Sequence, residues 1–241
     1  MGITGLNVDE INSKVAQYWS VSVTEETTST QSDLIKNFNS GNVLVAEYQS
    51  AGRGRLDRKF EVPPRKGLTF SFCISPDQDF GWIPLITGLA VANAINRYLN
   101  SDAVKIKWPN DLLINGKKLA GILSEKCESG VVVGVGINIY QTQAELPIAD
   151  AISLSMVRPV DRESLLIEIL NELGVVFSDI ENQKNMYRKQ CATIGAKVQA
   201  TLPDGEIIED FALGISNEGA LLLKSREIRV GDIVHLRYDG E

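Results

Sequence analysis

Residues 46–55 read Ala-Glu-Tyr-Gln-Ser-Ala-Gly-Arg-Gly-Arg, and they lie at the end of an apolar run that is typical of a β-strand. Glycine lets the backbone turn freely and approach a ligand closely. Arginine supplies a permanent cation whose planar fork of donors suits a carboxylate or a phosphate. The chain as a whole is acidic, with a formal net charge of −7, so composition does not account for Arg53 and Arg55 standing among glycines. The stretch therefore predicts a binding site for small anions.

Three further segments favour the same kind of site. They are Lys107-Trp108-Pro109-Asn110-Asp111, Lys117-Lys118-Leu119-Ala120-Gly121-Ile122-Leu123 and Gly134-Val135-Gly136-Ile137-Asn138. In order and spacing, the four segments resemble the biotin protein ligase family, and the resemblance covers most of residues 18–240. It implies an α+β fold, with a mixed central sheet and flanking helices like the catalytic domain of class II synthetases. A small SH3-like β-barrel is expected at the C-terminus.

Hydrophobic periodicity and turn residues predict the individual elements. Strands are expected at 19–24, 42–48, 68–74, 104–108, 111–114, 118–127 and 130–139, with a hairpin turn at Asn115-Gly116. A first helix is expected at 7–17, and a second begins after a hydroxyl-rich capping stretch that ends at Gln31. A third is expected from Pro84 to Leu99, and one long helix capped by Asp161 is expected from about 162 to 187. Short strands are expected at 196–202, 206–215, 220–224, 227–230 and 233–238. We therefore expect a catalytic domain at 1–189 and a second domain at 190–241.

Composition excludes several other classes. The 241 residues are 44% hydrophobic and 23% charged, as in an ordinary globular protein, and no apolar run is long enough to cross a bilayer. The acidic balance argues against a nucleic-acid surface, and fewer than twenty residues before the first strand leave no room for a DNA-binding domain. The N-terminus lacks the pattern of a signal peptide, and the three widely spaced cysteines fit reduced thiols. A cytoplasmic protein is expected.

The resemblance assigns roles to particular residues. Arg53, Arg55 and Lys118 are implied as the catalytic cations that stabilise charge on the biotin carboxylate and the phosphate. The implied biotin-binding residues are Ser29, Thr30, Gln49, Gly52, Arg53, Lys118, Gly121 and Gly134. The implied ATP-binding residues are Arg53, Arg55, Arg58, Asn110, Lys118 and Asn138. Asp111 is predicted to contact magnesium, directly or through water, because this ion favours one or two carboxylates together with phosphate oxygens.

Simpler interpretations stand beside these roles. Ser29 and Thr30 have the hydroxyls of a helix cap, and both functions are compatible. Trp108 is expected to be packed, and His235, the single histidine, is expected to be structural. The polar loop at 50–67 is long for a compact domain and is expected to be mobile without ligand and ordered with it.

The sequence also departs from the family pattern at three positions. The family often has glycine where Asp57 stands, tryptophan where Phe60 stands and asparagine where Gln31 stands. Asp57 places a carboxylate beside the anion site and is a candidate partner of Arg58 or Arg55. Phe60 keeps an aromatic ring but lacks the indole donor. We assign no ligand contact to Gln31.

The reaction implied by the resemblance has two steps. Biotin and ATP are joined to biotinyl-AMP with release of pyrophosphate, and the biotinyl group then passes to a lysine of a biotin carboxyl carrier domain. A lipoate or octanoate protein ligase of the same fold is an alternative, as is a non-catalytic biotin-binding regulator. The chain is expected to be a monomer or a homodimer, and the strands at 104–108 and 131–139 are candidates for pairing edge to edge between two copies.

Overall fold

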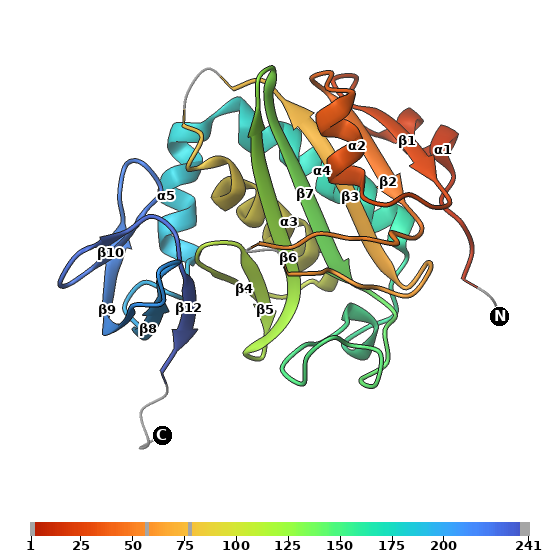
Figure 1. The fold of residues 1–241 in the computed structure, drawn as a ribbon. Helices are drawn as coiled ribbons and strands as arrows, with labels where there is room; N and C mark the ends of the chain where they lie inside the picture. The colour runs from red at the N-terminus through yellow and green to blue at the C-terminus, as the bar shows by residue number, and fades with distance from the viewer. Residues whose placement is uncertain (1–2, 56–57, 77–78, 237–241) are drawn as a thin grey trace.

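The computed structural model describes residues 3–55, 58–76 and 79–236. Its centre is a seven-stranded sheet with the order β1-β2-β3-β7-β6-β5-β4 (Figure 1). The strands are β1 Ser20–Thr24, β2 Asn42–Ala46, β3 Gly67–Ile74, β4 Val104–Lys107, β5 Asp111–Ile114, β6 Lys117–Cys127 and β7 Gly130–Asn138. Only the β1–β2 pair is parallel in this sheet, so the mixed central sheet predicted from the sequence is confirmed.

Helices cover both faces of the sheet. On one face, α3 Ile83–Leu99 packs against α4 Arg162–Ser178 and α5 Ile180–Gln190, and these helices lie behind the sheet in Figure 1. On the other face, the short helix α2 Thr30–Lys36 contacts β2, β3 and β7. The first helix, α1 Val8–Lys14, contacts β1 and α4. A 3₁₀ turn at Leu154–Met156 precedes α4.

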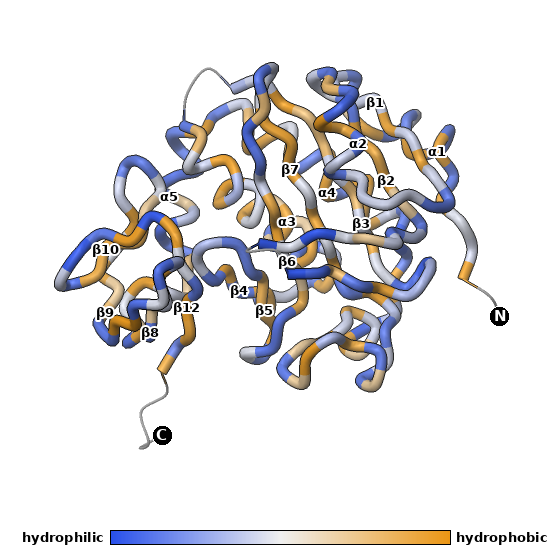
Figure 2. Tube along the Cα trace, in the orientation of Figure 1, coloured by the Kyte–Doolittle hydropathy of each residue, from blue (hydrophilic) through white to orange (hydrophobic). Residues whose placement is uncertain are grey.

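The core lies between the sheet and α3, α4 and α5. Apolar residues of α3 are fully buried along most of its length, and Figure 2 shows hydrophobic segments along the central strand β7 and hydrophilic residues at the surface turns. Burial of this apolar surface is the main favourable contribution to folding. All three cysteines are free thiols, as predicted. Within the described residues, no helix is both long and apolar enough to span a membrane.

A second, antiparallel sheet follows α5. Its order is β11-β10-β9-β8-β12, and it is drawn in blue beside β4 in Figure 1. The strands are β8 Lys197–Thr201, β9 Ile207–Ile215, β10 Leu221–Leu223, β11 Glu227–Ile228 and β12 Asp232–His235. Gly205 and Gly219 have φ of 89° and 86° at the β8–β9 and β9–β10 turns, which lie between the strands expected from the sequence. The expected small β unit at the C-terminus is present, and the domain boundary at 189/190 stays a prediction.

Two structural expectations are wrong. The helix expected at 162–187 is broken at Asp179, whose backbone leaves the helical region (φ −147°, ψ 67°) and whose side chain accepts a hydrogen bond from the Asn182 N–H to begin α5. Asp179 therefore ends one helix and caps the next. The 131–139 strand is not available for edge pairing, because β7 lies between β3 and β6 in the middle of the sheet. The 104–107 strand is at the edge, but Ile106 O there already accepts a hydrogen bond from Ala192 N.

Candidate functional site

One cavity of about 230 Å³ brings together nearly all of the residues predicted for the site. Its lining residues come from β3, β6 and β7, from the start of α2 and from the loop that crosses in front of these strands in Figure 1. The predicted residues in its lining are Ser29, Thr30, Gln49, Arg53, Arg55, Arg58, Asn110, Asp111, Lys118, Gly121, Gly134 and Asn138. Gly52 lies just outside the lining, and Asp57 lies outside the described residues.

Uncharged donors and acceptors form part of the cavity wall. Ser29 caps α2 and is buried, and Thr30, the first residue of the helix, meets Gln49 from the loop. Gln49 Oε1 accepts from Thr30 N at 2.8 Å and from Thr30 Oγ1 at 3.0 Å. Thr30 Oγ1 also lies 2.8 Å from Ser71 Oγ. Ser29 and Thr30 therefore begin the helix α2 and line the cavity at the same time, because this end of α2 faces the loop.

The sequence interpretation missed two residues of this wall, Gln31 and Ser71. Ser71 Oγ donates to Gln31 Oε1 at 3.1 Å, and Gln31 Nε2 donates to Val132 O at 2.9 Å. A Cβ at Gly134 would lie 2.8 Å from Gln31 Oε1, so glycine gives the longer glutamine side chain its room. The sequence did contain an indication that Ser71 faces the cavity. Thr69 and Ser71 alternate with large apolar residues on β3, so their polar side chains share one face of the strand.

Phe60 lies directly on the sheet, and both it and Gly136 line the cavity. A Cβ at Gly136 would come within 2.5 Å of the Phe60 ring, and a Cβ at Gly52 would come within 2.3 Å of Phe60 O. Phe60 N donates to Gly52 O at 2.9 Å, which holds the two sides of the loop together. The glycines at 52 and 136 therefore permit a close approach of loop to strand. The expected mobility of the loop without ligand stays a prediction.

Three of the loop arginines, Arg53, Arg55 and Arg58, have partners near the cavity. Arg53 donates to both carboxylate oxygens of Glu125 at 3.0 and 2.9 Å, and Arg58 pairs with Asp232 of β12. Arg55 donates to Asn110 Oδ1 at 3.0 Å and is within 3.4 Å of Gly231 O. Desolvation by burial lowers the pKa of Arg55 from its ordinary value. Arg55 nevertheless keeps its positive charge, because arginine remains protonated in proteins. The C-terminal β unit thus contacts two of the cavity arginines directly.

Lys118 is held rigidly at the cavity. Its ammonium lies 2.6 Å from Asp111 Oδ1. Its backbone is fixed on both sides, because Lys118 N donates to Asp150 O at 2.7 Å and Lys118 O accepts from Ile152 N at 2.9 Å. The half-buried ammonium therefore occupies a defined position, as electrostatic stabilisation of a reacting anion requires.

Two asparagines of the predicted ATP site make contacts within the protein. Asn138 is 3% exposed, and its Oδ1 accepts from Gln141 Nε2 at 2.9 Å, while its Nδ2 lies 3.3 Å from Ile152 O. Asn110 Nδ2 donates to Ile122 O at 3.1 Å, and its Oδ1 receives the Arg55 hydrogen bond. A contact of either side chain with a nucleotide stays a prediction.

The chemistry of Asp111 fits a magnesium ion that arrives with a nucleotide. In the described part of the chain, no three His, Cys, Asp or Glu side chains come together to hold a metal. Asp111 Oδ1 is buried and accepts no hydrogen bond of normal geometry, although the Lys118 ammonium is close. Magnesium is commonly bound by one or two carboxylates together with phosphate oxygens. Asp111 alone can therefore be the protein ligand of such an ion.

The residues expected to be structural behave as expected. Trp108 is 1% exposed, and its indole N–H donates to Gly219 O at 3.0 Å, which joins the two sheets. His235 Nε2 lies 3.0 Å from Thr193 Oγ1. Desolvation, with a smaller contribution from the charge of Lys107, lowers the pKa of His235 below its usual value.

Comparison with known proteins gives the class of this chain. The model of the biotin/lipoate A/B protein ligase family matches residues 20–141. A biotin–[acetyl-CoA-carboxylase] ligase of Mycobacterium tuberculosis is 34% identical over 235 residues, which cover 89% of this chain and 88% of that protein. The chain belongs to the biotin/lipoate A/B protein ligase family.

Further relatives indicate the branch of the family. The bifunctional ligase/repressor of Escherichia coli is 31% identical over 80% of this chain, which corresponds to 64% of that protein. The structure of a biotin protein ligase from Aquifex aeolicus in complex with biotin and ATP has a TM-score of 0.78 at 29% identity, covering 90% of this chain and 99% of that one. The resemblance to biotin protein ligases and the prediction of a ligase enzyme are therefore confirmed.

Proposed function

We propose that this chain activates biotin with ATP and transfers the biotinyl group to a lysine of a carrier domain. The observation that carries the proposal is that two kinds of wall meet in one cavity. Thr30, Gln49 and Ser71 supply uncharged donors and acceptors, which a ureido ring needs. Arg55 and Lys118 supply positive charge, which a carboxylate and a phosphate need.

In the first step, a biotin carboxylate oxygen bonds to the α-phosphorus of ATP, and pyrophosphate leaves as the bond to its bridging oxygen breaks. Both reactants are anions, and two unit charges 4 Å apart repel by about 1 kcal/mol in water and about 4 kcal/mol at the effective dielectric near a protein surface. Arg53, Arg55 and Lys118 offset this repulsion, and Arg58 assists at the phosphate. Because the fold fixes these cations beforehand, little reorganisation is needed during the reaction.

The carboxylates around the cavity support this assignment. Glu125 pairs with Arg53, and Asp111 pairs with Lys118. A substrate carboxylate or phosphate has the same sign of charge as these side chains and forms the same kind of hydrogen bond. The substrate therefore exchanges one ion pair for another, and the cations do not have to lose a complete shell of water.

In the second step, the lysine amine of the carrier bonds to the carbonyl carbon of biotinyl-AMP, the bond from that carbon to the AMP oxygen breaks, and the excess proton passes to solvent. No nucleophile from this chain is required. Exclusion of water from the cavity limits hydrolysis of the mixed anhydride. Ser29, Gly52, Gly121 and Gly134 complete the biotin site in this proposal.

The remaining assignments follow from the same reaction. Asn110 and Asn138 belong to the ATP site, and Asp111 holds magnesium together with the phosphates, where the ion neutralises phosphate charge. We assign the catalytic domain to residues 1–189 and a second domain to 190–241. The acceptor is the carrier domain of a biotin-dependent carboxylase, and the enzyme acts in the cytoplasm as a monomer or a homodimer.

The test is pyrophosphate release by the purified chain with ATP and magnesium, in parallel with biotin, lipoate, octanoate and no acid. Release with biotin alone is the expected result. Release with lipoate or octanoate instead would assign the chain to the other branch of the family. Tight biotin binding without release would support a non-catalytic regulator and contradict the proposal.

A further inference from the structure

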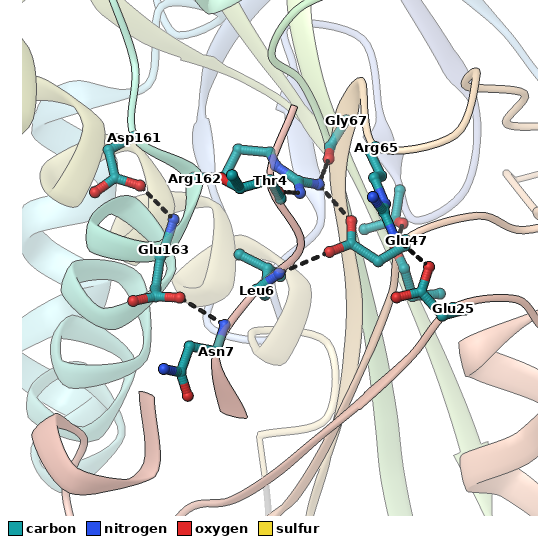
Figure 3. A network of polar contacts seen from close by, with 12 residues as sticks. Thr4, Leu6, Asn7, Glu25, Glu47, Arg65, Gly67, Asp161, Arg162 and Glu163 are labelled. Atoms are coloured by element: carbon teal, nitrogen blue, oxygen red, sulfur yellow. Dashed lines mark hydrogen bonds and ion pairs between the residues drawn. The ribbon is translucent and has the colours of Figure 1, made fainter. Parts of the chain in front are cut away.

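A single buried guanidinium connects the two ends of the loop that carries the arginines. Arg162, the first residue of α4, is 3% exposed, and Glu47, which follows β2, is 4% exposed. Arg162 Nη1 donates to Glu47 Oε2 at 2.7 Å and to Gly67 O, at the start of β3, at 3.1 Å (Figure 3). The loop begins after Glu47 and ends before Gly67, so one side chain holds both of its ends.

The start of the chain is attached to the same pair. Arg162 Nη2 donates to Thr4 O at 3.1 Å, and Glu47 Oε1 accepts from Leu6 N at 2.9 Å (Figure 3). The neighbouring Glu163 accepts from Asn7 N at 2.6 Å. Residues 4–7 therefore cover the ion pair and use up hydrogen-bonding positions that water would otherwise occupy.

Stability alone is a weak reason for such a pair. Moving two charges out of water costs several kcal/mol per ion, and well-packed apolar residues often replace a buried pair without loss of stability. What an apolar pair cannot supply is the planar fork of arginine, which here reaches a carboxylate and two backbone carbonyls in different directions. The Arg162 side chain is therefore suited to fixing the positions of Glu47, Gly67 and Thr4 relative to one another.

The position that it fixes leads directly to the cavity. Glu47 is also held through its backbone, since Glu47 N donates to Thr24 O and Glu47 O accepts from Arg65 N, at 2.9 and 2.8 Å. Two residues further on, Gln49 Oε1 makes the two hydrogen bonds with Thr30 in the cavity wall. Since only Tyr48 separates Glu47 from Gln49, a displacement of Glu47 is passed directly to the polar wall.

We propose that Arg162 is a positioning residue of the ligase, which sets the biotin-binding geometry of Gln49 by bracing Glu47 against Gly67 and the N-terminal segment. It touches no substrate. The proposal rests on the proposed function, because it assigns the Gln49 wall to biotin.

The first test compares Arg162→Lys with Arg97→Lys. Lysine at 162 keeps a charge for Glu47 but cannot also reach Gly67 O and Thr4 O. Arg97 of α3 is the control, because it also pairs with a carboxylate of α4, Glu172 at 2.6 Å, and lies outside the cavity lining; its side chain is 54% exposed, whereas that of Arg162 is 3% exposed. For Arg162→Lys we expect the biotin Kd, measured by calorimetry without ATP, to rise about tenfold, the size of one lost hydrogen-bonded contact. The KM for biotin should rise with it while kcat changes little, and Arg97→Lys should match the wild type.

A double variant keeps the test decisive where a single substitution prevents folding. Arg162→Met with Glu47→Leu removes both charges and leaves no buried ion unpaired. We expect a folded variant with the same rise in the biotin Kd and a lower melting temperature, because Leu6 N, Thr4 O and Gly67 O lose their side-chain partners. A biotin Kd within twofold of the wild type in a folded variant would overturn the inference. Failure of the wild-type chain to bind biotin would instead overturn the proposed function.

Discussion

Replacing Lys118 by alanine should nearly abolish the activation of biotin while leaving the fold intact. The ammonium lies 2.6 Å from Asp111 and its side chain is 33% exposed, so it is partly shielded from water. A unit charge 4 Å from a reacting oxyanion contributes about 4 kcal/mol at an effective dielectric of about 20. At about 1.4 kcal/mol per factor of ten, this is roughly a thousandfold in rate. Because Arg53 and Arg55 remain, the expected loss in the adenylation rate is about a hundredfold to a thousandfold.

The assay is single-turnover pyrophosphate release with saturating biotin and ATP, together with a thermal melt. Lys117→Ala is the matched control, since Lys117 is the exposed neighbour on the same strand. It should keep the wild-type rate. Loss of the Lys118–Asp111 pair should lower the stability by about 1–3 kcal/mol, because the buried Asp111 Oδ1 is left without its cation. An adenylation rate for Lys118→Ala within threefold of the wild type would refute the assigned role.

A second comparison separates the lost cation from the exposed carboxylate. Without Lys118, the charge of Asp111 is balanced only by the magnesium ion that it is proposed to hold, and repulsion of the substrate anions can slow the reaction by itself. The double variant Lys118→Ala with Asp111→Asn removes that charge. We expect it to be at least as slow as Lys118→Ala, because it also lacks the proposed magnesium ligand; recovery of most of the rate would show that repulsion by Asp111, rather than loss of Lys118, caused the defect.

Three further predictions concern the cavity wall, the loop and acid stability. Gly136→Ala pushes aside the Phe60 ring that lies on this glycine. It should raise the biotin Kd, measured by calorimetry, about tenfold and lower the stability by about 1–3 kcal/mol through overpacking. An unchanged biotin Kd would contradict the assignment of this part of the cavity to biotin. Glu125→Gln releases Arg53 from its ion pair and should lower the KM for ATP by up to about fivefold, the range of an exposed pair, whereas a raised KM would mean that Glu125 orients the arginine. The pKa of Glu145 is lowered to about 2, first by its hydrogen bond from Lys66 and then by contacts with Thr142, so this carboxylate stabilises the fold above about pH 4.5 and the contribution is lost as the pH falls through about 2. Melting temperatures recorded between these pH values should fall less in Glu145→Gln than in the wild type, and parallel curves would exclude this contribution.

Features that depend on neighbouring residues were predictable from the sequence. Asp161 caps α4 through Glu163 N, as its place before an amphipathic helix indicates. Asn115 and Gly116 both have positive φ in the β5–β6 hairpin, which is the conformation that this dipeptide favours. The motif residues gather in one cavity for the same reason, because strands of predictable length bring their ends and loops to one face of the sheet.

The partners of the charged residues could not be predicted in this way. Arg53 and Glu125 are 72 residues apart in the sequence, and Arg58 and Asp232 are 174 apart. No periodicity connects such positions, since the pairing depends on how the loop crosses the sheet and where the second sheet lies. The sequence argument assigned Arg58 to phosphate, named Asp57 as a candidate partner of Arg58 or Arg55, and gave the C-terminal unit no part in the site. Because Asp232 lines the cavity and pairs with Arg58, the charge that lines the cavity is set jointly by the loop and the C-terminal unit. A change in the placement of that unit would therefore alter the proposed anion site without any substitution in the recognised motifs.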